Sequence, residues 1–161
     1  MAIFAPRPRL RGLLMRNLFA AAALCLAFAG PAFADDKVYV QLPDLSDYWK
    51  PGGMDLLYQL ARAQTAITNC PGVSVTAAEA SLLSDSADIL MHLQDIDTAA
   101  YEAEYAEVAL AQLDCSVDGP DVRDAIDELV GLGGSREALP DQAQAAKDYQ
   151  AMLAERDAAA N

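Results

Sequence analysis

The segment ITNCPGVSVTAAE, residues 67–79, ends one predicted helix and begins the next, with a cysteine at the junction. Pro71 cannot continue a helical hydrogen-bond ladder, so the first helix is predicted to stop at Asn69. Thr76 and Glu79 have the spacing of a capping box, in which each side chain bonds the other residue's backbone N–H. The second helix is therefore predicted to begin directly after Thr76.

Apolar residues at helical spacing extend this pattern to five predicted helices. Their expected ranges are 54–69, 77–93, 99–113, 120–130 and a last helix after Pro140 that frays at its end. Short turns make consecutive helices antiparallel neighbours. Val38, Val40 and Leu42 alternate with polar residues before the first helix. The expected fold is all-α, a bundle of four to five helices with an extended N-terminal strap.

Residues 1–34 have the order of a secretory signal peptide, with four arginines, then an apolar run over 18–29, then a small-x-small motif ending at Ala34. That run is too short for a spanning helix, which needs about 20 residues. We expect cleavage after Ala34, a single helical domain over 35–161, and a periplasmic or secreted location in a Gram-negative bacterium. Translation is expected to start at Met1 or at Met15, since a complete signal also begins at the second methionine.

Cleavage removes Cys25 and leaves Cys70 and Cys115, an even pair in an exported chain. An oxidising compartment makes a disulfide the expected state of such a pair. In an alternating bundle the ends of the first and third helices meet, and the two cysteines lie at those ends. The bridge is predicted to join them and to contribute about 4 kcal/mol in the loop-entropy model.

The charge of the exported chain is strongly negative, because residues 35–161 hold seven basic and 24 acidic side chains, a net charge of −17. Binding to nucleic acid or anionic lipid needs clustered Lys and Arg, so both are excluded as expected partners. A basic periplasmic protein is the expected partner, and a merely solvated acidic surface is the alternative. The candidate partner-binding residues are Tyr48, Trp49, Glu102, Glu104 and Glu107. The alternative interpretation makes the two aromatic residues anchors of the strap and the three glutamates a solvated helix face.

The sequence contains none of the familiar catalytic patterns. His92 is the sole histidine, and no G-x-S-x-G nucleophile elbow accompanies it. Asp95-Ile96-Asp97 begins like a calcium loop, but Ala100 and Ala106 stand where the glycine and the bidentate glutamate belong. We therefore expect no catalytic residue, no metal site and no cofactor.

The run from Cys70-Pro71 through the Thr76-capped helix to Val108-Ala-Leu110-Ala-Gln-Leu113-Asp-Cys115 resembles the Tai-type immunity proteins, which neutralise cell-wall amidase toxins in the periplasm. Its layout is also similar to that of the periplasmic acid-stress chaperone HdeA, another small helical protein with one long disulfide loop. The likeness covers a third to a half of the exported chain. It implies a small helical protein that acts by binding other proteins.

Three hypotheses of function follow from these observations. The first is a non-catalytic protein that binds another protein, as an immunity protein, inhibitor or accessory subunit. The second is an acid-activated chaperone, because protonating the carboxylates would turn the net charge positive and open the chain by self-repulsion. The third is an enzyme that uses paired carboxylates.

Overall fold

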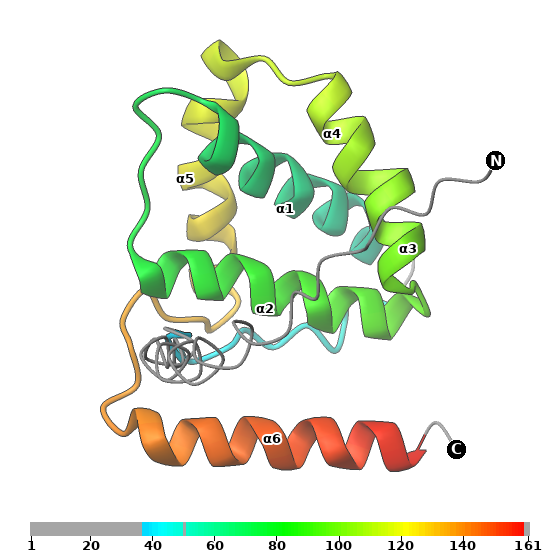
Figure 1. Cartoon of the computed structure of the whole chain (residues 1–161), viewed down its shortest axis with the longest axis vertical. Helices are drawn as coiled ribbons and strands as arrows, with labels where there is room; N and C mark the ends of the chain where they lie inside the picture. The colour runs from blue at the N-terminus through cyan, green and yellow to red at the C-terminus, as the bar shows by residue number, and fades with distance from the viewer. Residues whose placement is uncertain (1–36, 50, 160–161) are drawn as a thin grey trace, which may run out of the picture. The chain divides into compact units, whose positions relative to one another are not determined.

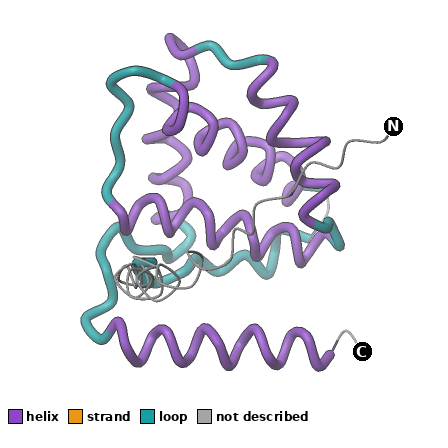
Figure 2. Tube along the Cα trace, viewed as in Figure 1, coloured by secondary structure: helices purple, strands orange, loops and turns teal. Residues whose placement is uncertain are grey.

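The computed structural model describes residues 37–49 and 51–159, with side chains as far as Glu155 (Figure 1). The predicted signal peptide and both candidate start sites lie outside these ranges. Within them every regular element is a helix, and the β contact between Val40 and Ala138 is an isolated antiparallel bridge (Figure 2). The predicted all-α class is thereby confirmed. None of the helices in the described ranges is both long and apolar enough to cross a membrane.

The helices pack through their leucines around α1. In chain order the elements are α1 (Gly52–Asn69), α2 (Ala77–Gln94), α3 (Thr98–Tyr101), the π-helical turn η1 (Glu102–Ala106), α4 (Glu107–Ala111), α5 (Cys115–Gly131) and α6 (Gln142–Ala159). Helix α1 contacts α2, α5, η1 and α4, and α2 also contacts α5. The largest apolar side chains with almost no exposure are Leu57, Leu60, Leu82, Leu83, Leu90, Ile126 and Leu129. Each such leucine contributes roughly 1.5–3 kcal/mol by its burial.

The predicted capping box at the start of α2 is present. The Glu79 N–H donates to Thr76 Oγ1 at 3.2 Å, and the Thr76 N–H donates to Glu79 Oε2 at 2.8 Å. Arg123 from α5 adds an ion pair to the other oxygen of Glu79 at 2.6 Å. Burial by itself would raise the pKa of Glu79, but the Thr76 N–H and the Arg123 charge outweigh it and lower that pKa. The cap therefore connects α2 to α5 and favours an ionised Glu79.

The predicted disulfide between Cys70 and Cys115 is also present, with 5.3 Å between the two Cα atoms. Cys70 follows the end of α1 and is buried, whereas Cys115 is the first residue of α5 and is exposed. The bridge thus joins α1 to α5, and not to the end of the third predicted helix.

The predicted start of the fourth helix at Pro120 is wrong by five residues, because the helix already begins at Cys115. Asp114 caps this earlier start. Its side chain accepts a hydrogen bond from the Ser116 N–H at 3.0 Å, and its own backbone N–H donates to Asp118 Oδ2 at 2.7 Å. Pro120 stays inside the helix at the cost of one backbone hydrogen bond, that to the carbonyl of Ser116. The Asp114 cap and the Asp118 side chain favour the earlier start.

The third predicted helix, 99–113, forms as three consecutive pieces that end at Ala111. Asp97 caps its start by accepting from the Ala100 N–H at 2.8 Å. The middle piece, η1, is a π-helical turn, which the apolar spacing of the sequence does not indicate.

The strap, residues 37–49, is extended as predicted and pairs with the connection between α5 and α6. Its hydrogen bonds include Ser135 N–H to the Gln41 carbonyl at 2.9 Å and Leu139 N–H to the Tyr39 carbonyl at 2.8 Å. The buried side chains of the strap are Val40, Pro43 and Leu45. Trp49 is 68% exposed, so its predicted role as a structural anchor is wrong.

Candidate partner-binding groove

A groove with a volume of about 410 Å³ lies between α1 and the segment α3–η1–α4. We call it the acidic groove. It is lined from α1 by Ala61, Gln64, Thr65, Thr68 and Asn69, and from the other side by Tyr101, Glu102, Ala106, Glu107 and Leu110. Two of the three candidate glutamates are therefore on the same surface.

The wall formed by α1 is polar but uncharged. Thr68 Oγ1 donates to the Gln64 carbonyl at 3.0 Å, and Asn69 Nδ2 donates to the Thr65 carbonyl at 2.9 Å. These bonds to their own helix hold both side chains against α1. The result is a wall of hydroxyl and amide groups with no positive charge among its residues.

The π-helical turn explains why Glu102 and Glu107 share the groove. In an α-helix of 3.6 residues per turn, two residues five apart are rotated by about 140° from each other and face different directions. Here the Glu107 N–H donates to the Glu102 carbonyl, the i→i+5 bond of a π-turn, which holds more residues per turn than an α-helix. An α-helix would place these two carboxylates on different faces. The wider turn brings both of them to the same edge of the groove.

Two tyrosines of the segment α3–η1–α4 lie close to these glutamates in the sequence. The rings of Tyr101 and Tyr105 stack with centroids 5.9 Å apart. Burial raises the pKa of Tyr101, and the charge of Asp88 raises it further; burial and then Glu104 do the same for Tyr105. Both hydroxyl groups are therefore neutral at physiological pH, and Tyr101 offers the groove a neutral aromatic surface.

The groove keeps its negative charge because the basic side chains are engaged elsewhere. Four of the five Lys and Arg side chains that the structure places form ion pairs within the chain. These pairs are Lys37–Asp85, Arg62–Asp118, Arg123–Glu79 and Arg136–Asp127. Three of the acidic partners, Asp85, Asp118 and Glu79, are buried. No basic residue lines the acidic groove, so Glu102 and Glu107 face solvent without a cation from its own lining.

The other candidate partner-binding residues lie outside this groove. Glu104 is exposed on η1 but is not part of the lining. Tyr48 and Trp49 precede α1; Tyr48 is half-buried and its carbonyl accepts from Gln94 Nε2 at 2.7 Å. Trp49 remains a large exposed apolar side chain on a separate surface.

The polar wall of α1 was missed by the sequence analysis. Its signal is a set of neutral polar residues one and four positions apart at the end of an otherwise apolar helix, namely Gln64, Thr65, Thr68 and Asn69. This spacing marks one face of a helix. It does not reveal which neighbour that face meets.

A second opening, also of about 410 Å³, lies beside Cys115 and the loop 71–74. Its charged residue, Arg123, already donates to Glu79 at 2.6 Å and to the Ser74 carbonyl at 2.6 Å. Arg123 is thereby committed to the fold, and this opening presents a weaker site for a charged partner than the acidic groove.

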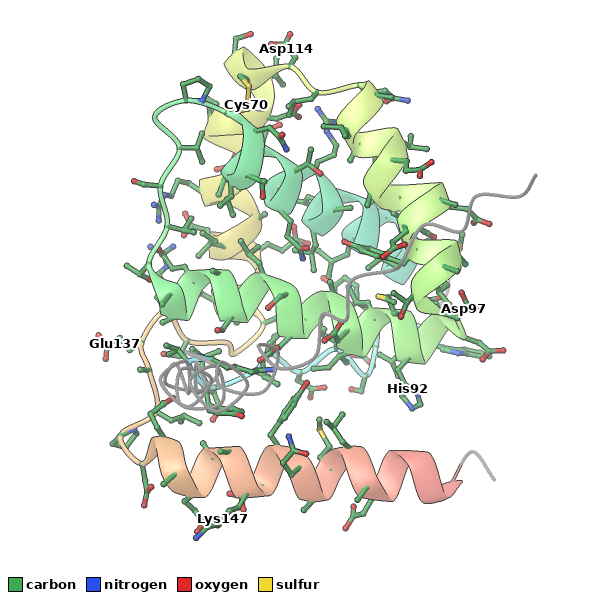
Figure 3. The ribbon with its side chains drawn as sticks, in the orientation of Figure 1. Cys70, His92, Asp97, Asp114, Glu137 and Lys147 are labelled. Carbon is green, nitrogen blue, oxygen red and sulfur yellow. A yellow bond between two sulfur atoms is a disulfide. The ribbon has the colours of Figure 1, made fainter. Side chains whose placement is uncertain are left out.

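His92 is exposed on α2 and projects toward α6 (Figure 3). Among the described residues no group of three or more His, Cys, Asp or Glu side chains has an arrangement suited to a metal ion.

No protein-family model, curated protein or solved structure matches this chain.

Proposed function

We propose that this protein is a non-catalytic binding protein of the cell envelope that uses the acidic groove to hold a basic segment of another protein. The observation that carries the proposal is the pair of exposed carboxylates, Glu102 and Glu107, on a groove whose lining contains no basic residue. Electrostatic complementarity of this kind speeds encounter and selects among partners.

The groove also offers apolar contact. Leu110 lines it and is 55% exposed, so a bound partner has apolar surface to cover. Exposed ion pairs contribute only about 0–1 kcal/mol each, because water and salt screen them. Covering an exposed leucine contributes about 1–2 kcal/mol. We therefore expect a partner that inserts Lys or Arg between the glutamates and covers Leu110 with an apolar side chain.

The role of immunity protein, inhibitor or accessory subunit accords with this chemistry. A small helical protein with exposed carboxylates along a groove suits the blocking of a basic surface. The layout of cysteines and caps that resembles the Tai-type immunity proteins supports the same role. Export and oxidation, both predicted from the sequence, would place the protein beside such partners.

Charge-matched variants test the proposal. Glu102→Gln with Glu107→Gln removes both rim charges, while Glu104→Gln with Glu137→Gln removes two charges from exposed residues outside the lining. Each purified form is used to capture proteins from a periplasmic extract at low salt. We expect the wild type and the control pair to retain one stoichiometric basic protein, and the groove pair to lose it at least about tenfold. Equal capture by all three forms would contradict the proposal.

An acid-activated chaperone is the second candidate, favoured by the three buried carboxylates that each rely on a basic partner. Protonation of Glu79 would leave Arg123, a partly exposed side chain of α5, without its counter-charge. The predicted result is opening of the chain and suppression of client aggregation at about pH 2–3, where carboxylates are protonated. Clients that aggregate as fast with the protein as without it would end this idea.

A further inference from the structure

Helix α6 is fixed to the strap near its beginning. Tyr39 exchanges two hydrogen bonds with the side chain of Gln142, its N–H to Oε1 and its carbonyl from Nε2, both at 2.8 Å. One to two turns later, Lys37 Nζ lies 3.8 Å from the centroid of the Tyr149 ring, and the Tyr39 ring lies 5.7 Å from it. The first half of α6 is thus held by the backbone of Tyr39 and by the side chains of Lys37 and Tyr39.

Beyond this attachment α6 runs alongside α2 (Figure 1), and residues of both helices line an open cavity. Two cavities, of about 310 Å³ and about 230 Å³, lie along this boundary. They share Leu42, Asp85, Tyr149 and Met152 in their linings. Shared walls make them one elongated groove, which we call the α6 groove.

The walls of the α6 groove are mainly apolar. Ile89 and Leu93 come from α2, Met152 and Leu153 from α6, and Leu42 from the strap. Met152 is 42% exposed, so one side of the groove opens to solvent. An apolar cavity of about 150 Å³ suffices to bind a benzene-sized molecule, and ligand sites begin at about 300 Å³. The α6 groove therefore has room for a medium-length alkyl chain.

The charges along this groove select the head group of such a ligand. Three carboxylates line it, Asp85 and Asp88 on α2 and Asp148 on α6. The basic side chain beside it, Lys37, is paired with Asp85 at 2.8 Å. His92 is the remaining ionisable group that α2 contributes to the lining. At neutral pH the lining is net negative, which favours a cation and repels an anion.

We infer that the α6 groove binds a small amphiphile with an unbranched apolar chain and a positively charged head group. The chain lies between α2 and α6, and the head group lies at the carboxylates. This site is separate from the acidic groove, so its failure and that of the proposed function are distinguishable.

Isothermal titration with ligands of matched chain length tests the inference. The probes are decyltrimethylammonium, decanol and decanoate, added to the purified protein with the two ions below their micelle concentrations and decanol below its solubility limit. The expected result is one site per chain, tightest for the cation and weakest for the anion. Octyltrimethylammonium is expected to bind about fifteenfold more weakly than the decyl form, since each buried CH₂ contributes about fourfold. Binding of none of the probes, or preference for decanoate, would overturn the inference.

Variants locate the site. Met152→Gln and Leu93→Gln change the α6 wall and the α2 wall without altering charge, and Val117→Gln is the control at an exposed apolar residue of α5. We expect the two groove variants to weaken decyltrimethylammonium at least about tenfold and the control to leave it unchanged. Asp148→Asn should reduce the preference for cation over anion while decanol binding stays constant. Met152 is exposed, so Met152→Gln should fold even if Leu93→Gln does not. Equal binding of decyltrimethylammonium by Met152→Gln and Val117→Gln would refute the site.

Discussion

Removing the disulfide by Cys70→Ser with Cys115→Ser is expected to destabilise the fold by about 4 kcal/mol. The bond closes a sequence separation of 45 residues. Opening a loop of that length restores about 13 cal/mol/K of chain entropy to the unfolded state, or about 4 kcal/mol at room temperature. The folded contacts of α1 with α2 and α5 remain, so the variant should still fold within the roughly 5–15 kcal/mol available to a domain.

Urea unfolding followed by circular dichroism measures this loss. The m-value should rise in the variant, because an unbridged unfolded chain exposes more surface. Cys70 is buried, so a serine at this position also destabilises the fold by burying a hydroxyl group. The wild type reduced with a phosphine loses the disulfide without this substitution, and so separates the loss of the bridge from the burial of the hydroxyl. We expect the reduced wild type to lose about 4 kcal/mol and the double variant that or slightly more. A loss below about 1 kcal/mol in the reduced wild type would refute the loop argument.

Three further changes test local features of the fold by the same unfolding assay. The pKa of Glu79 is held below its ordinary value of 4.5, so its contribution to stability is complete above that pH and is lost as pH falls further. Glu79→Gln should therefore flatten the dependence of the unfolding free energy on pH in this acid range. An unchanged slope would contradict the assignment. A Cβ at Gly53 would collide with the Tyr48 carbonyl, so Gly53→Ala should lower the free energy of unfolding by about 1–3 kcal/mol despite its better helix propensity. Gly52 has open space around it, so Gly52→Ala is the control and should lower it by nothing. Asp118→Asn should cost about 2 kcal/mol by leaving Arg62 without its buried partner, and adding Arg62→Met should recover part of that loss.

The features that the sequence predicts well are those set by neighbouring residues. The Thr76–Glu79 capping box needs only a spacing of three and forms as expected. The Cys70–Cys115 pairing follows once one cysteine pair and an alternating bundle are assumed. The first depends on neighbouring residues alone, and the second needs the cysteine count and the coarse order of the helices.

The features that the sequence does not reveal depend on competition between local options. Pro120 looks like a first-turn proline, but the bonds between Asp114 and Asp118 start the helix earlier. The π-helical turn carries no mark in the apolar spacing, because it changes which polar residues share a face and leaves the core pattern intact.

The composition of the candidate site shows the same limit. Glu102, Glu104 and Glu107 look equivalent in the sequence, and only the wider turn of η1 selects the first and the last for the acidic groove. Trp49 looks like a core anchor because large aromatic residues usually are, yet it follows the buried part of the strap and stays exposed.

Site-specific photo-crosslinking tests the central claim, that the acidic groove holds a basic protein, most directly. A benzoylphenylalanine at Thr68, an exposed residue of the groove lining, is compared in cells with one at Val117, an exposed residue outside it. We predict that the Thr68 probe forms one main adduct with a basic protein, that Glu102→Gln with Glu107→Gln strongly reduces the yield of this adduct, and that the Val117 probe forms none. The same adduct at equal yield from both probes, or no loss on neutralising the glutamates, would contradict the account.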